Sequence, residues 1–161
     1  GMSLHRIFVA GFVRRWHTNP DLAHTCDRVD GHAARVARFL IYLWPQSRLE
    51  VVRAALIHDD GEISTGDMSA TLKNRRPDLA YSLAEIEAAE INAIWGAPDS
   101  LTIDETDRLK FCDRLDAFLW AKHHAPHVLD GDGWPKAQRW LQAQAYRLGV
   151  SDKVWFWTGG L

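Results

Sequence analysis

The sequence has few cysteines, almost no net charge and no long apolar run, and each of these absences excludes a class of protein. Its two cysteines, Cys26 and Cys112, form neither a CxxC redox motif nor a disulfide framework, so we expect two thiols in a reducing compartment. The net charge of -2 offers no basic surface to a phosphate backbone. No apolar run approaches the roughly 20 residues that cross a bilayer, and the stretch MSLHRIFVAGFVRRW carries too much charge for a signal peptide. We therefore expect a cytoplasmic protein that binds neither polymeric nucleic acid nor a membrane.

Strand signals are missing as well, because no segment alternates apolar and polar residues, and there is no internal repeat or low-complexity linker. What the chain does contain is the length of one ordinary domain, 161 residues, with 47% hydrophobic and 25% charged residues. This composition predicts one all-α domain with a single compact core.

Helical periodicity and helix-end signals locate the expected elements. Ser47 with Glu50, and Thr102 with Glu105, have the spacing of a capping box, in which side chain and backbone satisfy each other at a helix start. Pro77 suits a first helical position, and Gly96 suits a helix end. The pattern predicts helices over 30–44, 47–59, 77–96, 102–124 and 135–149.

A possible metal site follows from the stretch ALIHDDGEISTGDM, in which His58 and Asp59 fall at the end of an apolar helix. Their adjacent side chains diverge by about 100° and can occupy neighbouring positions around one cation. Further ligands would come from His32, near the start of the first long helix, and from Asp113 inside another. Two imidazoles and two carboxylates suit a borderline divalent transition ion. The alternative is that His32 caps a helix, His58 is a core histidine and Asp113 faces solvent.

The order of these residues, His, then His-Asp, then Asp, resembles the HD superfamily of metal-dependent phosphohydrolases. Residues 58–67 match the pattern HDxxExxTGD, which is similar to the bacterial 5'-deoxyribonucleotidase branch of that superfamily. Lys73 and the upstream pair Arg15 and Trp16 also stand where that branch has a lysine and an Arg-Trp pair. The resemblance covers residues 12 to about 120.

The resemblance implies a single HD domain, a helical bundle over 1–161 with its core in roughly 12–150, and a homodimer. It implies hydrolysis of a (deoxy)ribonucleoside 5'-monophosphate to nucleoside and phosphate, with Trp16 checking the 2'-position of the sugar. The site would hold one divalent ion, for which Co, Mn, Fe, Zn and Ni are not distinguished. Its implied ligands are His32, His58, Asp59 and Asp113.

The chemistry also assigns roles to the polar residues near the proposed ion. Arg15 and Lys73 can stabilise negative charge on the phosphoryl oxygens. Glu62 can protonate the leaving 5'-oxygen or orient the attacking water, and Asp67, after flexible Gly66, can hold water or the nucleoside. The alternative for Glu62 and Asp67 is a solvated loop in which Asp67 makes a turn.

Two other functions remain open. One is a non-catalytic nucleotide-sensing HD module, and the other is an HD hydrolase of guanosine tetraphosphate. Two-metal cyclic-nucleotide phosphodiesterases fit less well, because no histidine lies between Asp59 and Asp113. The chain departs from the branch at RVDG, before His32, and at Ser69 and Thr71, before Lys73, so the preferred base and sugar stay open.

The remaining clusters predict structure more than function. His123, His124 and His127 have metal-like spacing, but Pro126 breaks the helix that would align them, and we expect no ion there. The run DGDG at 130–133 lacks the other ligands of a calcium loop and predicts a turn. Trp155 and Trp157 are expected to pack on the domain or on a second copy.

Overall fold

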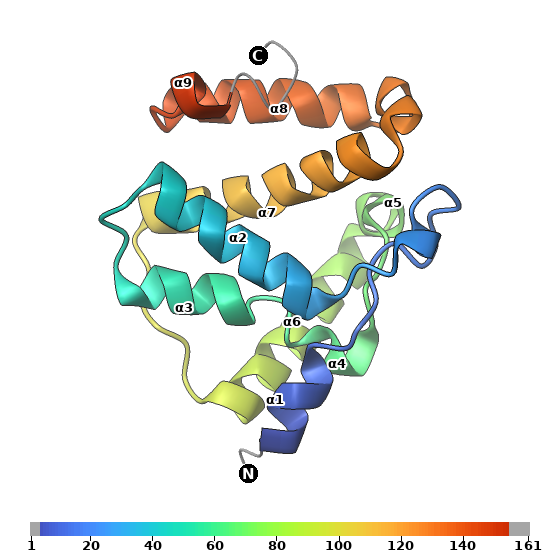
Figure 1. Ribbon diagram of the computed structural model, residues 1–161. Coiled ribbons are helices and arrows are strands. Elements are labelled where there is room, and N and C mark those ends of the chain that lie inside the picture. Colours follow the sequence, from blue (N-terminus) through green and yellow to red (C-terminus); the bar gives the residue numbers. More distant parts are fainter. Residues whose placement is uncertain (1–3, 155–161) are drawn as a thin grey trace. The chain divides into compact units, whose positions relative to one another are not determined.

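Every regular element in the part of the chain that the computed structural model describes, residues 4–154, is a helix (Figure 1). The prediction of an all-α fold is confirmed. The expectation for Trp155 and Trp157 lies outside the described residues. None of the described helices has the length and apolarity that a bilayer crossing requires. In chain order the elements are α1 (Leu4–Ala10), η1 (Ala23–Thr25), α2 (Val29–Leu43), α3 (Leu49–Ile57), α4 (Glu62–Thr65), α5 (Ala70–Arg75), α6 (Pro77–Trp95), α7 (Ile103–His124), η2 (Pro126–Asp130), α8 (Trp134–Arg147) and α9 (Ser151–Val154).

The ends of the two longest helices lie where the sequence predicts them. Pro77 opens α6, and Gly96 ends it with a φ of 87°, a left-handed conformation that glycine adopts without steric cost. At the start of α7 the hydroxyl of Thr102 accepts a hydrogen bond from the backbone N–H of Glu105, and the Glu105 carboxylate accepts one from the N–H of Thr102. The predicted capping box at Thr102 is therefore confirmed.

The elements differ from expectation around α3 and in the short helices. Helix α3 begins at Leu49, and the hydroxyl of Ser47 donates to the carbonyl oxygen of Trp44 at 2.6 Å instead of capping the helix. It ends at Ile57, and a separate one-turn helix, α4, follows. The short helices α1, α4 and α5 were not predicted, because a few residues do not show a helical period.

The chain divides into two compact units, which we describe separately. The first contains residues 1–34 and 53–100, and the second contains residues 35–52 and 101–161. In the first unit α4 and α5 pack against α6, and α1 packs against α4. In the second, α8 lies alongside α7, with η2 and α9 packed on α8 (Figure 1). The prediction of a single domain over 1–161 stays a prediction.

The second unit holds an ion pair between the buried Glu105 and the exposed Arg48, and this pair makes stability depend on pH. The guanidinium of Arg48 donates two hydrogen bonds to Glu105, at 2.9 and 2.7 Å, and Glu105 is 7% exposed. These bonds, with the backbone N–H of Thr102, lower the pKa of Glu105 to about 2. Because the pKa is lower in the folded state, the stabilisation is complete above the unfolded pKa of about 4.3 and is lost as the pH falls toward 2.

We therefore expect Glu105→Gln to reduce the free energy of unfolding at pH 7, with a progressively smaller difference from the wild type between pH 4 and pH 2. Glutamine can still accept the capping bond from Thr102, so the variant removes the charge and one hydrogen bond from Arg48 but keeps the cap. Urea unfolding at several pH values measures the difference. A difference that stays constant down to pH 2 would contradict this account of the ion pair.

Candidate metal centre

Three of the four predicted metal ligands, all in the first unit, meet around one point. His32 lies in the first turns of α2, and His58 and Asp59 directly follow α3. Oxygen Oδ2 of Asp59 lies 3.3 Å from Nε2 of His32 and 3.3 Å from Nε2 of His58. Potential ligand atoms of the three side chains lie within 4.8 Å of one another, so they can hold a metal ion together. The predicted convergence of these three residues is confirmed.

The ring of His58 is oriented for metal binding by a carbonyl group. Its Nδ1 lies 2.7 Å from the carbonyl oxygen of Ala55, one turn earlier in α3. Because a carbonyl oxygen only accepts hydrogen bonds, Nδ1 carries the proton of the neutral ring, and Nε2 keeps its lone pair. Ligating histidines typically donate their second ring nitrogen in this way. Nε2 of His58 is therefore available as a ligand.

Asp59 remains ionised in this environment. Burial raises the pKa of its carboxyl, but when the rings are protonated the charge of His58 and the hydrogen bonds from His32 and His58 oppose that effect, and the pKa lies well below its usual range. The side chain of His32 is fully buried, whereas those of His58 and Asp59 are 17% and 21% exposed. The neighbouring Asp60 instead accepts a hydrogen bond from Nε1 of Trp95 at 2.7 Å. Two imidazoles and an ionised carboxylate with a partly exposed side fit a divalent transition ion.

Asp113, the fourth predicted ligand, lies near the middle of α7 in the second unit and is half-buried. Its place among the ligands stays a prediction. Cys112 beside it is buried, and burial raises the pKa of its thiol, as does the charge of Asp113. The thiol is therefore neutral and unreactive at neutral pH.

Glu62 is buried beside the three ligands. It opens α4, its backbone N–H donates to the carbonyl oxygen of Asp59 at 3.0 Å, and the residue is only 6% exposed. The alternative of a solvated loop is thus wrong for Glu62. Gly61 explains the burial, because a Cβ at that position would lie 2.4 Å from the carbonyl oxygen of Glu87. Because glycine has no Cβ, α4 can approach the backbone of α6 directly.

The surroundings of the Glu62 carboxyl group disfavour a negative charge on it. Its Oε2 is buried without a hydrogen-bond partner, which the described residues show for only one other side-chain atom, Nε of Arg108. Burial raises the pKa of Glu62 to about 9, and the carboxylates of Asp59, Asp67 and Glu87 add to that effect. Buried polar groups are almost always satisfied in proteins. An unpartnered carboxyl beside potential metal ligands indicates a group that meets something else at this site.

The predicted Arg-Trp pair is held by two acids. The backbone N–H of Trp16 donates to Asp67 at 3.2 Å, and its indole N–H donates to Asp27 at 3.2 Å. The guanidinium of Arg15 donates to the same Asp27 oxygen at 2.7 Å. Trp16 has a φ of 64°, which is strained for a large side chain and persists only where the surroundings enforce it. Asp67 therefore has a defined partner, and it links the HDxxExxTGD segment to Trp16.

Two residues at this site were not found from the sequence. Asp27, which is 2% exposed, receives the side chains of both Arg15 and Trp16. Glu87 accepts a hydrogen bond from the hydroxyl of Thr65 at 3.2 Å and adds negative charge near Glu62. The sequence did contain a signal for Asp27, because the N–H groups of the Arg-Trp pair need an acceptor. It contained none for Glu87, which is one of several glutamates of α6 whose pattern indicates a solvent-exposed face.

The histidines near the end of α7 do not form a metal site. Among the described residues, no second group of His, Cys, Asp or Glu side chains is arranged to share an ion. There the ring of His124 packs on Trp120 with centroids 4.2 Å apart, and His123 meets His124 edge to face. The turn predicted at 130–133 is confirmed, with φ of 56° at Asp132 and 93° at Gly133.

Comparisons with models of protein families and with curated proteins give no match for this chain. The resemblance to HD phosphohydrolases therefore rests on the sequence motifs alone.

Proposed function

We propose that the protein is a metal-dependent phosphohydrolase that removes phosphate from nucleoside 5'-monophosphates. The observation that carries the proposal is the convergence of His32, His58 and Asp59 beside the buried, unpartnered carboxyl of Glu62. In this proposal Asp113 is the fourth ligand of one divalent ion, as the order of the motif implies. A deoxyribonucleotide is the favoured substrate, because residues 58–67 and the Arg15-Trp16 pair resemble the deoxyribonucleotidase branch. We also propose a homodimer on that resemblance.

The proposed reaction needs positive charge and a strong nucleophile, because a phosphate monoester dianion repels an incoming hydroxide. A divalent ion, when bound, supplies Lewis acidity and lowers the pKa of coordinated water by several units. Arg15 adds a fixed positive charge for the phosphoryl oxygens, and Lys73 adds a second close enough to affect Glu62 and Glu87. Fixed charges of this kind stabilise the transition state without having to reorganise during the reaction.

Glu62 is the proposed proton donor. Without a metal ion, burial and the charge of Asp59 raise the pKa of Glu62 to about 9, and burial, the largest cause, still favours the neutral carboxyl when an ion offsets the charge of Asp59. Its Oε2, which has no hydrogen-bond partner among the described residues, is then available to the substrate. A neutral carboxyl can give its proton to the leaving 5'-oxygen, which otherwise departs as an unstable alkoxide. Asp67 acts through Trp16, whose backbone it holds, and is in this scheme a positioning residue.

The proposed role of Arg15 and Trp16 can be tested at Asp27, their shared hydrogen-bond acceptor. We expect Asp27→Ala to raise KM for the nucleotide by roughly tenfold or more while changing kcat much less, because Arg15 and Trp16 both lose their shared acceptor. Steady-state kinetics on the metal-loaded protein measure both constants. Asp30→Ala is the matched control, since Asp30 is an exposed acid that pairs with Arg28. A folded Asp27→Ala protein with unchanged KM would argue against the proposed role of the Arg-Trp pair.

The function itself is tested by a substrate panel. The purified chain is stripped of metal, loaded with Mn²⁺ or Co²⁺, and assayed for release of phosphate or pyrophosphate from ribo- and deoxyribonucleoside 5'-monophosphates and from guanosine tetraphosphate, with 3'-monophosphates as controls. We expect release from 5'-monophosphates, and more from the deoxy forms. Absence of release from every compound would favour a nucleotide-sensing module. Hydrolysis confined to guanosine tetraphosphate would favour the other HD activity.

A further inference from the structure

The second unit contains an apolar cavity that the proposed hydrolase does not use. It has a volume of about 1020 Å³, which is at the upper end of the range for small-molecule sites, and α2, α7 and α9 line it. Its apolar lining consists of Phe39, Tyr42, Leu43, Leu115, Leu119 and Val154. Leu43, Leu115 and Val154 are almost completely buried, so they form its floor, whereas Tyr42 is 64% exposed.

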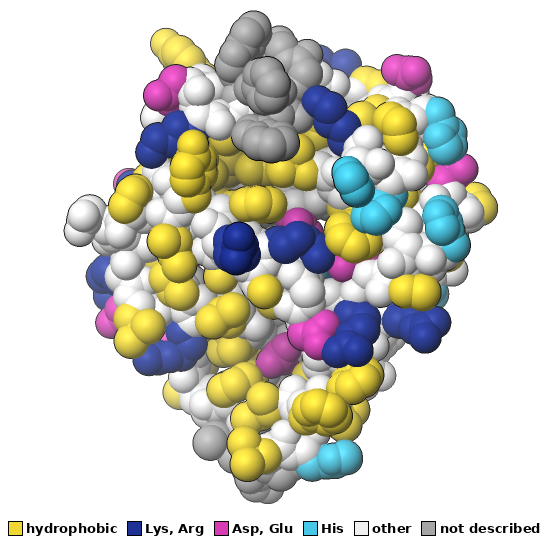
Figure 2. All heavy atoms as spheres, in the orientation of Figure 1, with side chains coloured by type: hydrophobic (Ala, Val, Ile, Leu, Met, Phe, Trp, Pro, Cys, Tyr) yellow, Lys and Arg dark blue, Asp and Glu magenta, His cyan; other side chains and the backbone are white. Residues whose placement is uncertain are grey.

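The described polar residues that line this cavity are basic or neutral. They are Arg38, Lys122, Lys153 and His123, and no acidic side chain lines it in the part of the chain that the structure describes. The ammonium group of Lys153 is held by the carbonyl oxygen of Leu43 at 3.2 Å and lies 5.8 Å from the ring of Tyr42. Figure 2 shows basic side chains set among hydrophobic ones on the face that includes α2. Positive charge therefore borders an apolar hollow.

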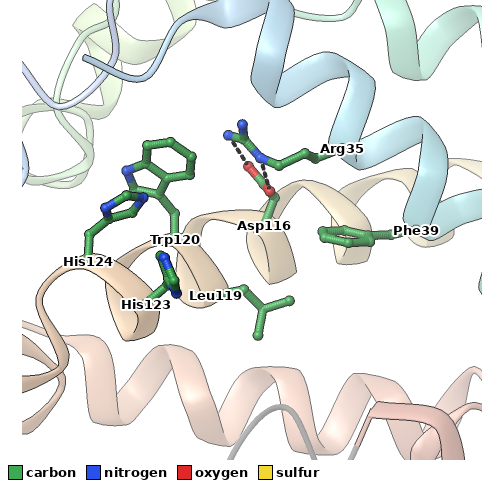
Figure 3. A pocket seen from close by; sticks show the side chains of 7 residues that line it. All are labelled: Arg35, Phe39, Asp116, Leu119, Trp120, His123 and His124. Atoms are coloured by element: carbon green, nitrogen blue, oxygen red, sulfur yellow. Dashed lines mark hydrogen bonds and ion pairs between the residues drawn. The ribbon is translucent and has the colours of Figure 1, made fainter. Parts of the chain in front are cut away.

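A smaller neighbouring cavity of about 330 Å³ shares Phe39, Leu119 and His123 with the first (Figure 3). The one acid that lines it, Asp116, is 1% exposed and accepts hydrogen bonds from Arg35 at 2.7 and 3.1 Å. Figure 3 shows this ion pair beside Trp120, over which the Arg35 guanidinium lies at 4.3 Å. The acidic side chain among the described residues of the smaller cavity is thus paired with a guanidinium, which offsets its charge.

We propose that the larger cavity binds a long-chain carboxylate, that is, a fatty acid. Its alkyl chain lies against the leucines and aromatic rings, and its carboxylate lies at the rim near Arg38, Lys122 and Lys153. The lining favours a lipid-like anion, because most of its described residues are apolar and its charged side chains are cations. Arg38, Lys122 and Lys153 offer only hydrogen-bond donors. An alkyl carboxylate matches them, because its head group has only acceptors.

The test uses the full chain with palmitate as the probe, followed by tryptophan fluorescence and by isothermal titration below the micellar concentration. We expect saturable binding of one palmitate per chain. Hexadecanol lacks the charge and butyrate lacks the chain, so each should bind at least about tenfold more weakly. Equal binding of hexadecanol would overturn the assignment of the basic rim. Absence of saturable palmitate binding would overturn the proposal as a whole.

Two variants and one control locate the ligand. Arg38→Glu reverses a charge at the rim, and Leu119→Asp places a charge in the wall, so both should weaken palmitate binding about tenfold or more. Arg139→Glu makes the same charge change on an exposed residue of α8 outside the cavity and should leave binding unchanged. Equal affinity in Arg38→Glu and Arg139→Glu would overturn the proposed position of the carboxylate. If Arg38→Glu instead converted a dimer to a monomer in sedimentation, with no palmitate bound to either, the face would be a self-interface and the proposal wrong.

Discussion

Replacing His58 by alanine is expected to abolish binding of the proposed divalent ion and to lower the proposed phosphate release by about a thousandfold or more, since both the Lewis acid and the activated water would depend on that ion. Nε2 of His58 faces the same Asp59 oxygen as His32, and its Nδ1 is held by Ala55. Without this ring two potential ligands remain in the first unit, and the ring is only 17% exposed, so water must enter the gap. Elemental analysis of the dialysed protein and a phosphate-release assay measure the two effects.

His127→Ala is the matched control for this prediction, because His127 is an exposed histidine in η2. It should retain both metal and activity. Circular dichroism establishes that each variant is folded. A His58→Ala protein that binds the ion as tightly as the wild type would contradict the proposed ligand set, whatever its activity.

The second large effect is expected from Glu62→Gln, which keeps the shape of the side chain and removes its acidic proton. We expect kcat to fall about a hundredfold or more with the metal retained, because the leaving oxygen loses its proton donor. Glu85→Gln provides the control, since Glu85 is an exposed acid on α6. Wild-type turnover in Glu62→Gln would remove the proposed role of Glu62 while leaving the metal ligands in place.

The same variant should also be more stable than the wild type when both are free of metal. Burial and the carboxylate of Asp59 raise the pKa of Glu62 to about 9, so ionising it costs folding free energy. For an acid whose pKa is higher in the folded state, the cost is absent below the unfolded pKa of about 4.3 and is complete above the folded pKa. The gain in stability of Glu62→Gln should therefore grow from pH 5 to pH 9. A gain in stability that does not change with pH would mean that ionising Glu62 costs the wild-type protein no folding free energy.

The long helices could be predicted because their signals are local. The capping box of Thr102 and Glu105 and the glycine at position 96 act on neighbouring backbone groups, so their effect is visible in a few residues of sequence. Helix α4 has four residues, and it depends on the close contact of Gly61 with the backbone of α6. That contact joins residues 26 positions apart, and nothing in the local pattern around Gly61 indicates it.

The convergence of His32, His58 and Asp59 could be predicted for a different reason, which is that the order His, then His-Asp, resembles a known metal-binding motif. The supporting residues Asp27 and Glu87 were not predicted. Asp27 and Glu87 act through hydrogen bonds with Arg15, Trp16 and Thr65 that form only after the chain has folded. In sequence Glu87 resembles any exposed acid, whereas Asp27 could have been sought as the acceptor of Arg15 and Trp16.

The most direct test of the metal centre is anomalous diffraction from crystals of the protein grown with Co²⁺. The account predicts one strong peak per chain within bonding distance of the Nε2 atoms of His32 and His58 and of the Asp59 carboxylate, with Asp113 as the fourth protein ligand. Absence of a peak at these three side chains, or a peak only at the histidines near the end of α7, would contradict it.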